Sequence, residues 1–206
     1  MGKRIGIYLA GLAAAALGIA LIILSLLGAG PWDSVAVGLN NHLGLTIGMW
    51  SIISQVFFTF LTWMIEKTRF RIESIIPIVI RSWFLDIWIY FVFRNADFSS
   101  SWEVQLFSLT IGVIIVGVGI GIYVEAQFPT TPIDGLMMAI SNRFGWSLSI
   151  SRISIEANGA LCGFLLGGPV GLGTLVVALF LGKIIQTSNR QIKKMLHVQT
   201  KPFETH

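Results

Sequence analysis

Residues 30–45 read GPWDSVAVGLNNHLGL, and residues 131–146 read TPIDGLMMAISNRFGW. In both stretches an aspartate follows a proline by two positions, and a glycine closes the segment. Proline suits the first turn of a helix, aspartate interacts favourably with the positive end of the helix dipole, and glycine suits the left-handed position after a helix. The stretches therefore predict short helices over residues 31–43 and 132–144, the second opened by a capping box between Thr131 and Asp134.

These two stretches belong to an internal duplication with an offset of 101 residues. Without a gap, eight positions between Leu9 and Ile52 carry the same residue as their counterparts, and most of them are proline, glycine, aspartate or asparagine. Such residue types fix backbone geometry, so their agreement indicates a repeated structure. We divide the chain into unit one (1–101), unit two (102–190) and a basic tail (191–206).

The composition predicts an integral membrane protein. Hydrophobic residues make up 54% of the chain and charged residues 12%, against about 25% charged residues in soluble proteins. The single cysteine, Cys162, lies in an apolar run and is interpreted as a packing residue. A chain with so few charges cannot cover a soluble domain with polar groups.

Six segments are predicted to span the bilayer, because about 20 apolar residues are needed to cross it. The segment over 72–93 is the most polar of the six, since it contains Glu73, Arg81 and Asp86. The first segment is interpreted as a retained span and not as a signal peptide. The predicted spans are 5–28, 46–65, 72–93, 104–128, 148–167 and 171–190.

The basic residues orient these spans. With six spans, lysine and arginine collect on the side that holds both termini, and Arg94 is the only basic residue on the other side. Positive charge marks the cytoplasmic side, so both termini are expected in the cytoplasm. This bias explains the net charge of +4 without a nucleic-acid partner. Because three spans per unit is an odd number, the fold is predicted as all-α, with two inverted three-helix repeats.

The short helices have two alternative placements. One face of each is apolar, as expected of a helix lying on the membrane surface. A re-entrant helix packed inside the bundle also keeps one apolar face, and it carries Asp33 or Asp134 into a polar pocket together with Asn41 or Asn142. The two aspartates are either structural caps or ligands for a proton, a cation or an amine.

Ionisable residues at membrane depth are further candidates, because they are costly there and usually face partners or water. Arg81 and Asp86 are five residues apart in the third span, so each is expected to find a partner on another helix. Arg152 and Glu156 are four residues apart and can pair with each other. These residues either pair structurally or form a substrate or proton path with Asp33 and Asp134.

Enzyme chemistry is not indicated. The three histidines are scattered and have no neighbouring cysteine or carboxylate cluster, so we expect no metal site. The sequence has no phosphate-binding loop and no nucleophile elbow, and no cofactor is expected. Gly11, Gly18, Gly112 and Gly119 recur at seven-residue spacing and predict close helix packing.

The motifs resemble those of the YczE/YitT-type family of bacterial inner-membrane proteins. The matching motifs are residues 30–33, 38–39 and 44–52 in unit one, and residues 132–135, 171–174 and Gly182 in unit two. The resemblance covers most of residues 5–190. It implies a multi-spanning plasma-membrane protein of generally unassigned activity, without catalytic residues to transfer.

Two functions are consistent with this sequence. The first is a small transporter in which one unit rocks against the other around a pocket between the short helices, because inverted repeats are the usual architecture of secondary transporters. The acidic excess of the pocket favours a cation, an amine or proton coupling, and the small volume enclosed by six spans favours a homodimer in the lipid bilayer. The second is a membrane scaffold or regulatory protein that moves no substrate.

Overall fold

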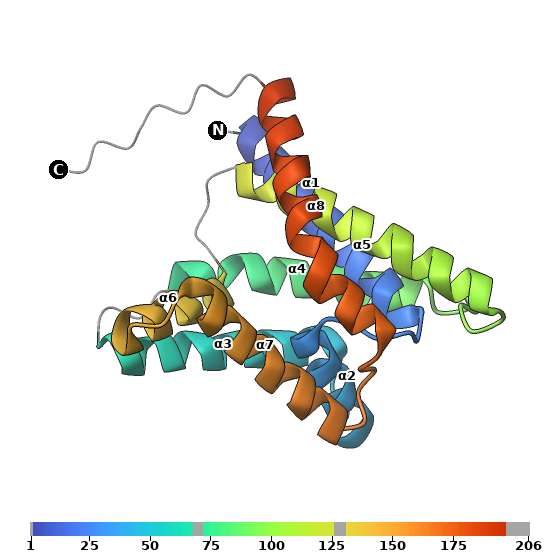
Figure 1. Cartoon of the computed structure of the whole chain (residues 1–206). Helices are drawn as coiled ribbons and strands as arrows, with labels where there is room; N and C mark the ends of the chain where they lie inside the picture. The colour runs from blue at the N-terminus through green and yellow to red at the C-terminus, as the bar shows by residue number, and fades with distance from the viewer. Residues whose placement is uncertain (1, 68–71, 126–130, 197–206) are drawn as a thin grey trace.

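The computed structural model describes residues 2–67, 72–125 and 131–196, and within these ranges the chain is helical (Figure 1). Both short helices have the predicted bounds. In unit one the described helices are α1 (Gly2–Leu24), α2 (Pro31–Leu43), α3 (Ile47–Glu66), the 3₁₀ turn η1 (Ile72–Ser74), α4 (Ile76–Ile87) and the π-helical segment η2 (Trp88–Val92). In unit two they are α5 (Trp102–Glu125), α6 (Pro132–Phe144), α7 (Leu148–Leu165) and α8 (Leu172–Leu196).

Helix α8 continues past the predicted end of unit two. The first residues of the predicted basic tail are part of this helix. Residues 197–206 lie outside the described residues.

Equivalent positions of the two units make equivalent hydrogen bonds. The N-cap oxygens accept a backbone N–H three residues on, at 3.1 Å for Thr46–Met49 and 3.2 Å for Ser147–Ile150. Near the end of each short helix, one side chain donates to the carbonyl oxygen five residues further on, at 2.6 Å for Asn40–Leu45 and 2.7 Å for Ser141–Trp146. Each position in unit two is the unit-one position plus 101, so the repeat recurs at the level of single contacts.

Four helical stretches of the described chain are long and apolar enough to cross a membrane. They are Arg4–Leu24, Ile47–Glu66, Trp102–Val124 and Leu172–Ile192. Helix α4 has 12 residues and continues into the five-residue η2, and α7 has 18 residues but carries Arg152 and Glu156. The chain is therefore a membrane protein whose described residues are all-helical and provide four candidate spans, and the six-span arrangement stays a prediction.

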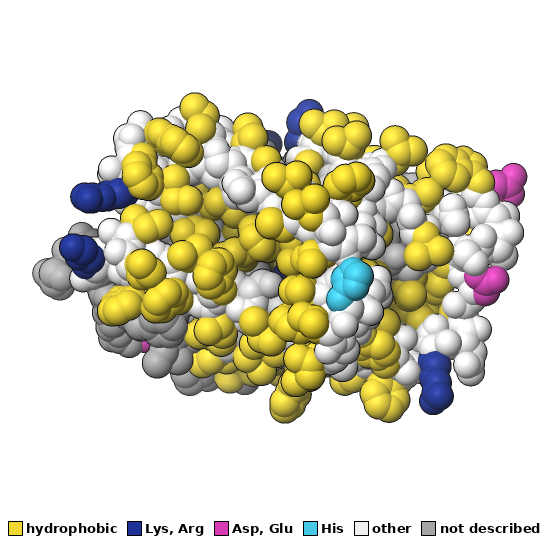
Figure 2. All heavy atoms as spheres, turned by 90° about the horizontal axis from the view of Figure 1, so that it is seen from below, with side chains coloured by type: hydrophobic (Ala, Val, Ile, Leu, Met, Phe, Trp, Pro, Cys, Tyr) yellow, Lys and Arg dark blue, Asp and Glu magenta, His cyan; other side chains and the backbone are white. Residues whose placement is uncertain are grey.

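The surface agrees with this membrane assignment. Large hydrophobic side chains are exposed on helices of both units, among them Phe57, Phe91, Phe107 and Phe164. Figure 2 shows one such face, where hydrophobic side chains cover the middle and the charged groups lie mostly towards the two ends. A soluble monomer rarely exposes so extensive an apolar surface.

The helices pack into two groups, each of which contains helices from both units. In the first group α1 packs on α4 and α5, and α5 packs on α8. In the second group α2 and α6 each pack on both α3 and α7. Of the helix pairs that join the groups, α3 and α4 pack closely, whereas α7 and α8 make few contacts. The two helix groups therefore do not coincide with the two sequence units.

Glycines explain why the first group crosses the unit boundary. A Cβ on Gly11 would lie 2.9 Å from the carbonyl oxygen of Gly119, and a Cβ on Gly18 would lie 2.6 Å from that of Gly112. The two helices approach so closely only because these side chains are absent, which confirms the predicted packing. As residue numbers rise along α1 they fall along α5, so α1 and α5 are antiparallel.

In the second group, α2 and α6 lie between α3 and α7. Figure 1 shows α2 near one end of α3 and α6 near the other. The indole Nε1 of Trp32 in α2 donates to the carbonyl oxygen of Ile155 in α7 at 3.2 Å, and its ring meets Phe58 of α3 edge-on, with the ring centroids 4.5 Å apart. Each short helix also buries small residues, such as Ser34 in α2 and Gly135 in α6.

Candidate functional site

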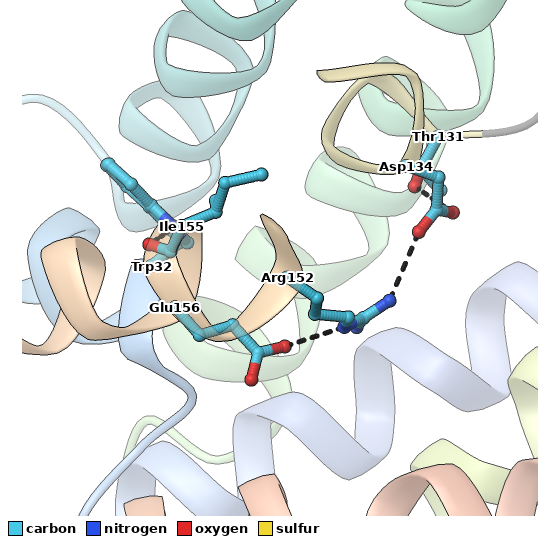
Figure 3. Close-up of polar contacts among 6 residues, drawn as sticks. All are labelled: Trp32, Thr131, Asp134, Arg152, Ile155 and Glu156. Carbon is cyan, nitrogen blue, oxygen red and sulfur yellow. Dashed lines mark hydrogen bonds and ion pairs between the residues drawn. The ribbon is translucent and has the colours of Figure 1, made fainter. Parts of the chain in front are cut away.

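Arg152 connects two of the predicted site residues (Figure 3). From the first turns of α7, its Nη1 lies 3.2 Å from Asp134 Oδ1 in α6, and its Nε lies 2.9 Å from Glu156 Oε1 one turn further along. The side chains of Arg152, Asp134 and Glu156 are 51%, 35% and 27% exposed. Two carboxylates share one guanidinium, so this cluster carries an excess of negative charge.

The start of α6 differs from the predicted capping box. The hydroxyl of Thr131 donates to Asp134 Oδ2 at 2.6 Å and accepts no backbone N–H. The Thr131 side chain therefore binds the Asp134 carboxylate and leaves the helix N–H groups uncapped by a side chain. This arrangement directs the second oxygen of Asp134 towards Arg152.

Asp86 of α4 binds the N-terminus of α3. Its Oδ2 accepts the hydroxyl of Thr46 at 2.5 Å, and its Oδ1 accepts the N–H of Gly48 at 2.8 Å. One turn along, the hydroxyl of Tyr90 accepts the N–H of Ile47 at 3.2 Å. A carboxylate at a helix N-terminus is favourable because it meets free N–H groups and the positive end of the dipole. We call these contacts the Asp86 clamp.

Arg81 lies on the same helix and faces the interior of the protein. Its Nη2 donates to Ser51 of α3 at 3.3 Å, and its buried Nε has no hydrogen-bond partner among the described residues. Its positive charge lies close enough to Asp33 of α2 to interact with that carboxylate.

The side chain of Asp33 folds back over Gly30, the residue before α2. A Cβ on Gly30 would lie 2.6 Å from Asp33 Oδ2, so the glycine leaves room for this carboxylate. By contrast, Asn41 and Asn142 are exposed near the C-terminal ends of α2 and α6, about two turns away from the aspartates. The hydrogen bond that recurs at those ends in both units is made by the preceding residues, Asn40 and Ser141.

A cavity of about 520 Å³ lies between α7 and α8, and both charged and apolar side chains line it. We call it the polar cavity because Arg152 and Glu156 distinguish it from the second cavity described below. Arg152, Glu156 and Ser149 line it from α7, Gly182 lines it from α8, and Pro31 lines it from the start of α2. The cavity therefore lies between the two helix groups and has Arg152 and Glu156 of the charged cluster in its wall. Its volume is in the range of ordinary small-molecule sites.

A second cavity, of about 510 Å³, lies on the other flank of α7 and is almost entirely apolar. Trp32, Phe58 and Leu136 form its walls, and Phe144 and Trp146 are among its lining residues. Within the described ranges no three histidine, cysteine or acidic side chains come together in a geometry that could hold a metal ion.

Comparison with known proteins places the chain in a family. Residues 2–190 match the profile of DUF6198, a family of unknown function. The uncharacterised membrane protein YczE of Bacillus subtilis (strain 168) is 32% identical over 191 residues, which are 92% of this chain and 87% of that protein. The chain therefore belongs to the YczE-type family of bacterial membrane proteins.

Two further relatives of this YczE-type protein match over most of their length. An uncharacterised protein of Haemophilus influenzae is 33% identical over 98% of this chain and 89% of its own. The uncharacterised protein YyaS of Bacillus subtilis is 30% identical over 86% of this chain and 88% of its own. No solved structure gives a significant match.

Sequence reasoning missed part of the site in this YczE-type protein. Neither Thr46 nor Tyr90 was selected from the sequence as a site residue, although the Asp86 clamp depends on both. A tyrosine four residues after Asp86, on the same face of one predicted span, was the signal available for Tyr90.

Proposed function

We propose that the protein is a small transporter of two inverted units, whose substrate occupies the polar cavity between α7 and α8. The single observation that carries the proposal is this cavity, which lies between two helix groups and contains Arg152 and Glu156 in its wall. Ionisable groups at membrane depth are rare and usually mark a path for a substrate or an ion.

Contacts within the fold support the inverted arrangement. The equivalent helices α1 and α5 are antiparallel, as a two-fold axis in the membrane plane requires. The packing of α2 on α7 also has its counterpart in the packing of α6 on α3, with the two units exchanged. Six spans, cytoplasmic termini and a location in the inner membrane belong to the same proposal.

The charges in and around the cavity favour a small cation, an amine or a proton as the substrate. Asp134 and Glu156 both pair with Arg152. Asp33 lies two residues after Pro31, which lines the cavity. The position of α2 and α6 between α3 and α7 supports the re-entrant placement of the short helices. A homodimer in the bilayer is compatible with this arrangement, and the alternative is a scaffold that moves nothing.

Uptake into vesicles separates transport from scaffolding. Purified protein is reconstituted into liposomes that contain a pH-sensitive dye, and methylammonium and potassium are offered with and without a pH gradient. We expect flux above that of protein-free liposomes, and a loss of at least about tenfold in Glu156→Gln and Asp134→Asn, since each variant removes one of two carboxylates in the cluster.

The matched control is Asp97→Asn in the loop before α5. Ser99 donates to Asp97 Oδ1 through its N–H at 2.8 Å and its hydroxyl at 2.6 Å, which holds the pKa of this carboxyl below its usual value. Asp97→Asn is expected to leave the flux unchanged. If the unmodified protein moves neither probe faster than empty liposomes, the transporter proposal fails and the scaffold alternative takes its place.

A further inference from the structure

Two related helix pairs adopt different arrangements in this structure. Helices α3 and α4 lie in the second and third predicted spans of unit one, and α7 and α8 lie in those of unit two. The first pair is held together by the Asp86 clamp and by the contact from Arg81 to Ser51. The second pair is separated by the polar cavity.

Equivalent positions make this asymmetry explicit. In α3, Gly48, Ser51 and Gln55 are buried against neighbouring helices, with Ser51 6% and Gln55 7% exposed. Their counterparts in α7, at an offset of 101, are Ser149, Arg152 and Glu156, and all three line the cavity. The same face of the repeat is therefore closed in one unit and open in the other.

The two helix groups provide a way to exchange these arrangements. Each group contains two helices from each unit, so rotating one group against the other opens the α3–α4 side while it closes the α7–α8 side. We propose that the protein has this second state and that Asp86 is the gate residue that holds the α3–α4 side closed. The inference rests on the proposed transport function and identifies the gate of the same cavity.

The chemistry of the clamp suits a gate. The two carboxylate oxygens of Asp86 accept hydrogen bonds from a hydroxyl and a backbone N–H at the N-terminus of α3. The carboxylate lies so close to α3 that a Cβ on Gly48 would be 2.7 Å from its Cγ. Replacing the carboxylate by an amide removes the charge and one acceptor oxygen. Hydrogen bonds to charged groups are the stronger ones, so this single change weakens the closed side substantially.

Cysteine labelling of the full chain in lipid nanodiscs tests the gate, because both faces are accessible there and no substrate is needed. In a Cys162→Ala background, Ser82→Cys reports on the α3–α4 side, since Ser82 is 1% exposed and its hydroxyl has no hydrogen-bond partner among the described residues. Ser149→Cys reports on the cavity side. A water-soluble maleimide is expected to label Ser149→Cys quickly and Ser82→Cys slowly.

Asp86→Asn is expected to raise the labelling rate of Ser82→Cys about tenfold, in keeping with the loss of one charge-assisted hydrogen bond, and to lower that of Ser149→Cys. If Asp86→Asn fails to fold, Tyr90→Phe removes only the hydroxyl that accepts the Ile47 N–H and should shift both rates in the same directions by less. Asp97→Asn should shift neither rate.

Two labelling results overturn the gate. Either Ser82→Cys becomes reactive while Ser149→Cys is unchanged, or neither rate changes in Asp86→Asn and Tyr90→Phe. Reciprocal labelling without any flux in liposomes leaves the gate standing and refutes the transport function. Flux without reciprocal labelling refutes the gate alone.

Discussion

At the scale of single residues, Trp32 fixes the position of α2 between two long helices. Its indole ring packs on Phe58 of α3, and its N–H binds α7 next to Gly159, where a Cβ would lie 2.7 Å from Nε1. The glycine in α7 is therefore required by the tryptophan in α2. Their contact joins a residue of unit one to a residue of unit two.

Gly159→Ala is predicted to lower stability by about 1–3 kcal/mol, as expected when an extra methyl group is forced into a packed interface. The measurement is thermal unfolding in detergent. Gly182→Ala in α8 is the matched control, because a Cβ there has no heavy atom within 4 Å, and it should be neutral or slightly stabilising. A smaller cost of Gly159→Ala in a Trp32→Phe background supports the contact, and an equal cost contradicts it.

Arg152 separates a structural role of the charged cluster from a functional one. Its side chain and that of Asp134 are more than one-third exposed, and exposed ion pairs contribute about 0–1 kcal/mol. Arg152→Gln is therefore predicted to change the unfolding temperature little and to abolish flux in the liposome assay. A large loss of stability, with the remaining flux in proportion to folded protein, contradicts a functional role.

At the scale of helices, much of the secondary structure was predictable because its signals are local. Proline at the start and glycine after the end fix α2 and α6, and Thr46 and Ser147 cap the helices that follow. The grouping of helices was not predictable, because it depends on which faces meet across the two units. The glycine stripe indicated close packing, but it did not name α1 and α5 as partners.

Part of the candidate site was predictable because its signal is local, and part was not because it depends on how helices meet. The pairing of Arg152 with Glu156 follows from their spacing on one helix. Its contact with Asp134 depends on how α6 meets α7, which no local pattern contains. Asn41 and Asn142 were selected because they are identical in the two units, yet the structure exposes both of them at helix ends.

The two equivalent helix caps are predicted to differ in strength. Ser147→Ala removes only the cap bond to Ile150 and should cost about 1 kcal/mol. Thr46→Ala removes the corresponding bond and also the contact with Asp86, so it should cost roughly 1.5–3 kcal/mol more. Thr46→Ser keeps both bonds and is the control. Equal unfolding temperatures for the two alanine variants contradict the role of the clamp.

At the scale of the whole molecule, the fold is two helix groups that meet closely along α3 and α4 and enclose a polar cavity between α7 and α8. Each group combines helices of both units, and the ionisable residues Arg81, Asp86, Arg152 and Glu156 lie on the helices that face each other across the groups. Under the proposed function, rotation of one group against the other opens either side without unfolding, provided that the two units are inverted in the membrane.

The orientation of the two short helices tests that condition most directly. Asn41→Cys and Asn142→Cys are each made in a Cys162→Ala variant, and intact cells that express them are treated with a membrane-impermeant maleimide. Both positions are exposed near helix ends, so both cysteines can react. With inverted units, Asn41→Cys is labelled from outside the cell and Asn142→Cys only after the membrane is permeabilised. Labelling of both cysteines from the same side contradicts the inverted arrangement and the transport proposal built on it.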